Sequence, residues 1–169
     1  MDDPNHYFYS GYLAGDKKYW SIFTDSWRIF IGSHQTMKSF VLRLEKGDEA
    51  ISKIVGFCAQ NDIENAWFSG FGAASSARLA IYDLEKKEYI RKEFSGILEI
   101  LNFLGNVGQM DGKTIVHSHV TLSNKDFSAF GGHVDELIIA ATCEIILHQL
   151  DITLARKRDD EIGLNLLDI

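Results

Sequence analysis

Cysteine is scarce in this chain of 169 residues, and long apolar runs are missing. Cys58 and Cys143 lie inside apolar segments without CxxC spacing, so we interpret each as a small buried hydrophobic side chain rather than half of a disulfide or a zinc ligand. No apolar run reaches the roughly 18 residues of a membrane span, and the first residues lack a basic segment followed by an apolar one. We therefore expect a soluble, unexported protein in a reducing cytoplasm.

An excess of positive charge is also lacking, since the formal net charge is −7. Most non-specific affinity for DNA comes from Lys and Arg contacts that release counterions, so an acidic chain starts at a disadvantage there. Two local basic runs, at 86–92 and 156–158, are interleaved with or followed by acidic residues. We interpret both as solvated hairpin edges, and DNA binding stays the alternative that net charge does not favour.

Proline occurs once, as Pro4, in a segment unlike the rest of the chain. Residues 1–36 are crowded with Tyr, Phe and Trp and show no sustained helical or strand period. A more orderly pattern begins at Met37, so we place a single domain at 37–169. The extension at 1–36 is either an added arm or translated sequence upstream of the true start.

From Met37 onward, one segment predicts a helix. The segment "SFVLRLEKG" reads as a strand closed by Gly47, and Asp48 is then a plausible N-cap. The residues that follow have the i, i+3, i+4, i+7 spacing of a long amphipathic helix with one buried face: Ile51, Ile54, Val55 and Cys58.

The remaining segments predict strands. Glycine bends interrupt an apolar stretch at 65–94, with a hairpin near Glu85–Lys87. The segments "ILEILNFLGNV" and "KTIVHSHVTLS" flank Asp111-Gly112, a strong hairpin signal. The run "ELIIAATCEIILHQLD" gives a further strand. Strands outnumber helices, so we expect an α+β fold with a mainly antiparallel sheet.

Three of the six histidines lie between Thr114 and Val134. Because side chains alternate along a strand, His117 and His119 share one face, with their backbones roughly 6.5–7 Å apart. Both rings can then converge on one ion at about 2.0–2.1 Å per Zn–N bond. His133 follows Gly131-Gly132, a pair that lets the backbone bend and aim the next side chain inward.

Three histidines with an open fourth position describe a catalytic type of zinc site. The alternative is an HxH pair on an exposed strand face that binds nothing, but the other histidines are scattered, which favours one site. We expect a divalent metal, with zinc as the first choice, although imidazole also suits iron, nickel, copper and cobalt.

Glu99 and Glu144 interrupt apolar runs, where an unpaired buried charge is costly. Each is a candidate catalytic residue, because a carboxylate there can orient a ligand histidine, bind the metal, or act as general acid or base. An ordinary salt bridge or an edge position is the structural alternative. Whether the chain is an enzyme, acting on a small oxygen-rich molecule, stays open.

The ordered segments "RLEKGDEAI", "GILEILNFLGNV", "DGKTIVHSHVTLS", "FGGHV" and "ATCEIIL" resemble the plants-and-prokaryotes conserved (PPC) domain across essentially all of 37–169. The resemblance implies an α/β fold with a mostly antiparallel sheet and a homotrimer. It also implies that His117, His119 and His133, at the family's HxH and GGH positions, bind a metal commonly taken as zinc.

The functional implication of this resemblance is less direct. Plant members join the domain to an AT-hook with an Arg-Gly-Arg-Pro core, and prokaryotic members carry the description "predicted DNA-binding protein" from that association. This sequence has no Arg-Gly-Arg-Pro. A more distant resemblance, in fold and in a three-histidine zinc site with HxH, links the domain to acetolactate decarboxylase, but folds host unrelated functions.

Overall fold

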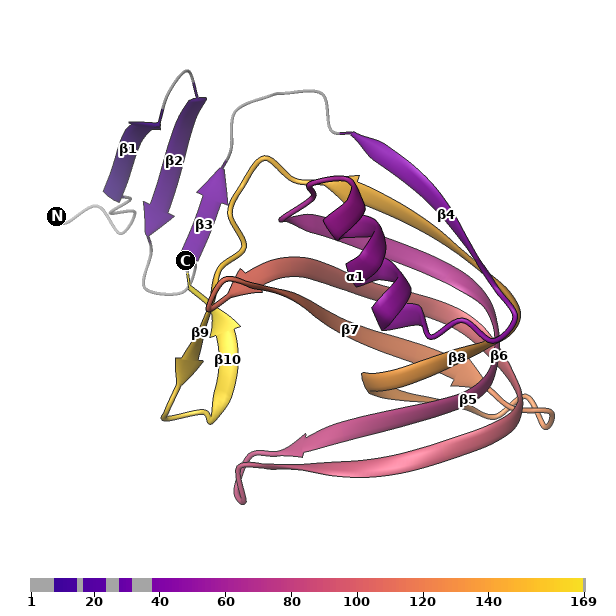
Figure 1. Ribbon diagram of the computed structural model, residues 1–169. Coiled ribbons are helices and arrows are strands. Elements are labelled where there is room, and N and C mark those ends of the chain that lie inside the picture. Colours follow the sequence, from indigo (N-terminus) through magenta and orange to yellow (C-terminus); the bar gives the residue numbers. More distant parts are fainter. Residues whose placement is uncertain (1–7, 15–16, 24–27, 32–37, 169) are drawn as a thin grey trace, which may run out of the picture.

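The computed structural model describes residues 8–14, 17–23, 28–31 and 38–168 (Figure 1). Near the amino terminus, three short strands form an antiparallel sheet in chain order. They are β1 (Phe8–Ala14), β2 (Lys17–Phe23) and β3 (Arg28–Ile31). The sequence period of this segment did not indicate them. No helix among the described residues has the length and apolar character that crossing a membrane requires.

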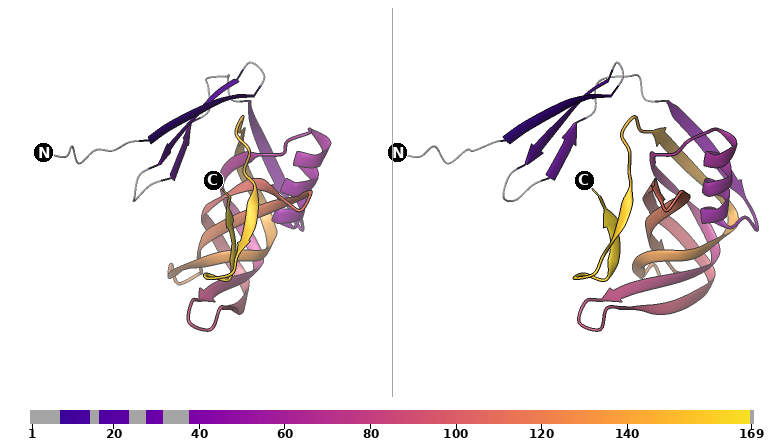
Figure 2. Two further views of the ribbon diagram at one scale, coloured as in Figure 1. Left: turned by 90° about the vertical axis from the view of Figure 1, so that its left-hand side faces the viewer. Right: turned by 60° about the vertical axis from the view of Figure 1, so that its left-hand side comes forward.

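The main sheet has five strands in the order β4-β8-β5-β6-β7, and every pairing in it is antiparallel. Its strands are β4 (Ser39–Glu45), β5 (Ala66–Asp83), β6 (Glu88–Met110), β7 (Lys113–Ser123) and β8 (Ala129–Gln149). An additional pairing between β7 and β8 closes four of the strands into a ring. The expected mainly antiparallel sheet is confirmed, and its long strands curve strongly (Figure 2).

The helix α1 (Ala50–Gln60) is shorter than predicted, with 11 residues. It lies against β7 and β8 (Figure 1). Of the four residues predicted for its buried face, Ile54 and Cys58 are buried and Ile51 and Val55 are partly buried, while Ala50 is buried in addition. The N-cap is Glu49 rather than Asp48, because the Glu49 carboxylate accepts hydrogen bonds from the backbone N–H groups of the first turn. Asp48 instead accepts one from the Glu45 N–H and closes the preceding turn.

Two hairpins follow the predicted turn residues. The β5–β6 connection lies at 84–87, and Lys87 there has φ 53°. The β6–β7 connection is Asp111-Gly112, with φ 51° and 72°. Positive φ at both central residues matches the twist of antiparallel strands, which is why Asp-Gly predicted this hairpin.

The core lies between α1 and the inner faces of the long strands. Phe68 on β5 and Phe103 on β6 are fully buried, with ring centroids 5.1 Å apart in an edge-to-face arrangement. Both cysteines are buried free thiols, as interpreted from the sequence, and burial raises the pKa of each to about 11.

A C-terminal hairpin completes the described chain. It consists of β9 (Arg156–Asp159) and β10 (Leu164–Leu167), which pair antiparallel. Both views of Figure 2 place this hairpin, in yellow, beside the long strands. The Tyr82 hydroxyl of β5 lies 3.0 Å from the carbonyl oxygen of Ile162 and 3.1 Å from that of Gly163. The tip of the hairpin is therefore held to the end of β5.

Candidate metal centre

Two of the three candidate ligands come from β7. The alternation of the strand buries Ser118, Val120 and Leu122 in the core and leaves His117 half-buried and His119 exposed. Because both histidines point away from the core, their rings lie on the same face, with centroids 5.3 Å apart. The predicted shared face of the HxH pair is confirmed.

The third ligand comes from β8, through the pairing that closes the ring of strands. His133 lies directly opposite His119 in the register, and its ring centroid is 5.2 Å from that of His117 and 5.5 Å from that of His119. The structure therefore brings all three predicted metal ligands together. The contact arises within a β-hairpin, because residues 124–128 connect the two strands and Ser123 pairs with Ala129.

The two glycines before His133 act differently from the prediction. Neither Gly131 nor Gly132 has a positive φ, so they make no special bend. A Cβ at Gly131 would lie 2.3 Å from the Val120 carbonyl oxygen, and one at Gly132 would lie 2.8 Å from the Ala80 carbonyl oxygen. Glycine is needed because β8 passes very close to both neighbouring strands at the point where the ring closes.

The geometry of the three imidazoles fits a metal ion. One nitrogen from each ring lies within 4.8 Å of the others. Nitrogens bound to one tetrahedral zinc at 2.0–2.1 Å lie about 3.4 Å apart, so small side-chain rotations suffice. The Nδ1 atom of His133 is buried without a hydrogen-bond partner among the described residues. A buried polar atom of this kind is costly unless something binds it.

The surroundings of the site lower the pKa of two of the three imidazoles. Burial is the largest cause that lowers the pKa of His117 to about 4, followed by the charge of Arg156 and the other two rings. Burial and then His119 lower the pKa of His133, while Asp135 raises it. Neutral imidazole is the form that coordinates a metal, so protons compete weakly for these two ligands near pH 7.

Arg156 on β9 joins the histidines and was not predicted as a site residue. Its Nη2 atom lies 3.1 Å from Nδ1 of His117 and donates to Oδ1 of Asn106 at 2.7 Å, while Nη1 donates to the Asn165 carbonyl at 3.0 Å. A guanidinium only donates, so Nδ1 of His117 accepts and the ring proton is on Nε2. The hairpin-edge interpretation of 156–158 is thus wrong for Arg156, which is half-buried.

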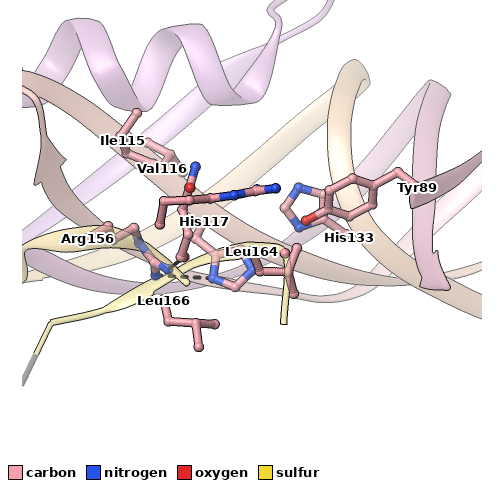
Figure 3. A pocket seen from close by; sticks show the side chains of 11 residues that line it. Tyr89, Ile115, Val116, His117, His133, Arg156, Leu164 and Leu166 are labelled. Atoms are coloured by element: carbon pink, nitrogen blue, oxygen red, sulfur yellow. Dashed lines mark hydrogen bonds between the residues drawn. The ribbon is translucent and has the colours of Figure 1, made fainter. Parts of the chain in front are cut away.

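A pocket of about 260 Å³ opens beside the histidines (Figure 3). Its polar lining includes Tyr89, His117, His133, Arg156 and Arg158. The Tyr89 ring lies 5.4 Å from the ring of His133, tilted by 30°. The apolar lining comes from β7 and from the C-terminal hairpin: Ile115, Val116, Leu164 and Leu166. The pocket thus lies between the long strands of the main sheet and the C-terminal hairpin.

The two candidate carboxylates lie elsewhere in the chain. Glu99 is exposed on β6 opposite Ser123, about 13 Å along β7 from His119. Glu144 is exposed on β8, opposite Arg43 and Phe71, and roughly 35 Å of extended strand separates it from His133. Neither lines the pocket, so one chain does not bring these carboxylates to the histidines.

Asn106 and Arg156 are the site residues that sequence reasoning missed. Asn106 interrupts the apolar run "NFLGNVG", the same signal that drew attention to Glu99 and Glu144, and its register partner is His117. For Arg156 no local signal existed, because it reaches the site only through the docking of the C-terminal hairpin.

Comparison with known protein families gives one match. The Plants and Prokaryotes Conserved (PCC) domain matches residues 31–151. No curated protein matches the chain in sequence.

Solved structures include similar chains. A metal-containing protein from Archaeoglobus fulgidus is 38% identical, with a TM-score of 0.73, over 77% of this chain and 92% of that one. A plant- and prokaryote-conserved protein from Pyrococcus horikoshii is 31% identical, with a TM-score of 0.74, over 79% of this chain and 94% of that one. A candidate DNA-binding protein from Ralstonia eutropha is 28% identical, with a TM-score of 0.72, over 76% and 90%.

The distant resemblance in fold is also found. The α-acetolactate decarboxylase from Bacillus subtilis is 11% identical, with a TM-score of 0.50, over 89% of this chain and 74% of that one. At this identity the likeness concerns the fold alone.

Proposed function

Because the chain belongs to the Plants and Prokaryotes Conserved domain family, we propose that it is a cytoplasmic metal-binding protein built on the domain at 37–169. In this proposal His117, His119 and His133 hold one divalent ion, zinc, and the adjoining pocket takes a small oxygen-rich molecule. The observation that carries the proposal is the convergence of three imidazole nitrogens within 4.8 Å. The buried, unpartnered Nδ1 of His133 supports it independently.

A metal held by three imidazoles would act as a Lewis acid toward a carbonyl oxygen or water at its remaining coordination position. The residues of the chain would define what reaches that position. His117 and His133 contribute neutral donors because burial lowers the pKa of both. The C-terminal hairpin and Tyr89 line the pocket beside His117 and His133.

Metal analysis tests the proposal. The protein, purified without a histidine tag, should contain about one divalent ion per chain, and the His117→Ala/His119→Ala variant should lose it. His148→Ala is the control, because His148 lies on β8, the strand of His133, but bonds to Ser39 and lies outside the pocket. Equal, substoichiometric metal in the wild type and the double variant would rule out the site.

We also propose that the protein is a homotrimer. Large apolar side chains are exposed on the outer faces of β4, β5 and β8: Val41 (79% exposed), Phe71 (59%), Ile146 (48%) and Trp67 (41%). Val41 is directly opposite Ile146 in the register, so these side chains form one patch of a kind that marks protein interfaces. Phe71→Asp should reduce the mass measured by light scattering, and Ile90→Asp on the β5–β6 hairpin should not. A monomeric wild type would contradict the proposal.

Proton transfer by Glu99 or Glu144 stays a prediction. Both lie outside the pocket of their own chain, so either would have to reach the site of a neighbouring subunit. Exposed apolar residues flank Glu99, with Ile97 76% and Leu101 55% exposed, and Glu144 lies opposite Phe71 of the apolar patch. Interface burial of both carboxylates is therefore compatible with the proposed trimer.

DNA binding is the second candidate function, and the similarity to a candidate DNA-binding protein favours it. The net charge of −7 opposes it, and several basic side chains already have acidic partners. Arg91 lies 2.7 Å from Asp135, and Arg156 faces the pocket. If DNA is bound, the basic residues of 86–92 and 156–158 should carry the binding, with steep salt dependence. Gel shifts without a complex at low salt would exclude this function.

A further inference from the structure

On the premise of the proposed metal site, the geometry points to small carboxylic acids as its ligands, with Arg156 holding the carboxylate and Arg158 adding charge at the rim. The charge of the side chains that line the pocket is opposite in sign to the net charge of the chain. Among the described residues two arginines and no aspartate or glutamate line it, although the chain carries a net charge of −7, and Arg158 also lies 4.0 Å from the exposed Asp160. A pocket of this kind attracts anions even when the whole protein repels them.

Arg156 is oriented but not neutralised. Asn106 and the Asn165 carbonyl fix the plane of its guanidinium from two sides. Among the described residues it has no ion pair, and its Nε atom is buried without a partner. A half-buried cation is stable when an anion compensates it, and a planar guanidinium matches a carboxylate better than a point charge does.

Metal binding would release a further donor of Arg156. If His117 held the ion through Nδ1, its lone pair would no longer accept from Nη2 of Arg156, and if it held the ion through Nε2, its ring proton would lie on Nδ1 and face that donor. Either case ends this hydrogen bond. One N–H of Arg156 then becomes available beside the metal ligands, where a carboxylate oxygen can accept it.

The size and walls of the pocket define the rest of the ligand. A volume of about 260 Å³ is below the roughly 300–1,000 Å³ of typical ligand pockets, which suits a small acid rather than a nucleotide. Ile115 and Val116 on β7 and Leu164 and Leu166 on β10 form apolar walls that suit a short aliphatic part (Figure 3). Phosphate has no apolar part to place there.

The anion-binding residues come from outside the family match. The match covers residues 31–151, whereas Arg156, Arg158, Leu164 and Leu166 belong to the C-terminal hairpin. The three histidines lie inside the match. The C-terminal hairpin therefore contributes the residues that select the ligand class, while the ring of long strands contributes the histidines that bind the metal.

The test uses the full chain loaded with Co²⁺, whose visible absorption responds to ligands at the metal. Butyrate, butyramide and inorganic phosphate are titrated in parallel, with calorimetry as a second readout. Butyrate should bind at least about tenfold more tightly than uncharged butyramide of the same shape, because charge-assisted hydrogen bonds contribute roughly 1.5–3 kcal/mol. Phosphate should bind more weakly than butyrate. Equal affinities for butyrate and butyramide, or a preference for phosphate, would overturn the inference.

Variants identify the residue that holds the carboxylate. Arg156→Gln should weaken butyrate binding about tenfold or more with unchanged Co²⁺ content, Arg156→Lys should lie between it and the wild type, and Arg43→Gln on β4 should have no effect. Unchanged butyrate affinity in Arg156→Gln would refute the role of Arg156 even if the metal site is real. A wild-type chain that does not bind Co²⁺ would instead refute the proposed function. The comparison of butyrate with butyramide needs no variant, so it still tests the ligand class if Arg156→Gln does not fold.

Discussion

Replacing Gly131 by alanine should open the closure between β7 and β8 and weaken metal binding without changing any histidine. The added Cβ would lie 2.3 Å from the Val120 carbonyl oxygen and 3.3 Å from the Thr121 Cα, both backbone atoms of β7. Comfortable separations of such atoms are about 3.5 Å, so the strands must part by about 1 Å. Neither neighbouring atom belongs to a side chain that can rotate away.

The cost of this separation follows from its place in the sheet. Overpacking of this kind destabilises a protein by about 1–3 kcal/mol. Thr121 opposite Gly131 is two positions from His119 opposite His133, so the displacement reaches the ligand pair directly. Metal–ligand distances tolerate changes of about 0.2 Å. A displacement of about 1 Å should therefore lower metal affinity at least about tenfold.

Urea unfolding with a chelator present measures the first effect, and competition with a metal indicator measures the second. Gly56→Ala in α1 is the matched control, because nothing lies within 4 Å of the added Cβ and its helical backbone suits alanine. It should stabilise the protein by about 0.5–1 kcal/mol and leave metal affinity unchanged. Wild-type stability and metal affinity in Gly131→Ala would refute the close-approach explanation.

Three further predictions concern pH, the C-terminal hairpin and the core. Because the pKa of His117 is about 4 in the folded chain and near 6.5 when unfolded, the unfolded chain binds more protons between these values. The metal-free protein should keep its stability above about pH 6.5 and lose stability as the pH falls toward about 4. In the His117→Phe variant the urea midpoint should depend less on pH. The same dependence of the midpoint on pH in the variant and the wild type would contradict this prediction. Tyr82→Phe removes the hydroxyl that bonds the hairpin tip, so amide hydrogen exchange in β9 and β10 should accelerate while exchange in central β5 stays unchanged. Phe103→Ala deletes a fully buried ring and should cost about 3–5 kcal/mol in urea unfolding, a loss that an unchanged midpoint would disprove.

Local sequence patterns determined much of the fold. Alternation along β7 put His117 and His119 on one face, Asp111-Gly112 set the β6–β7 hairpin, and the helical spacing gave the buried face of α1. Each of these features depends on residues a few positions apart, so the periods of strand and helix are enough to predict them. Two local predictions about the helix were wrong, namely its N-cap residue and its length. Two adjacent acids can each cap the first turn, and the helix ends after 11 residues.

Only the tertiary structure decided which groups meet at the site. The register of the β7–β8 hairpin puts His133 opposite His119, and the close approach of Gly131 to the Val120 carbonyl leaves no room for a Cβ there. Docking of the C-terminal hairpin brings Arg156 to His117, 39 residues away in sequence, while Glu99 and Glu144 fall on exposed positions outside the pocket. The placements of Arg156, Glu99 and Glu144 depend on sheet curvature and on long-range packing of the whole chain, which leave no period in any one segment.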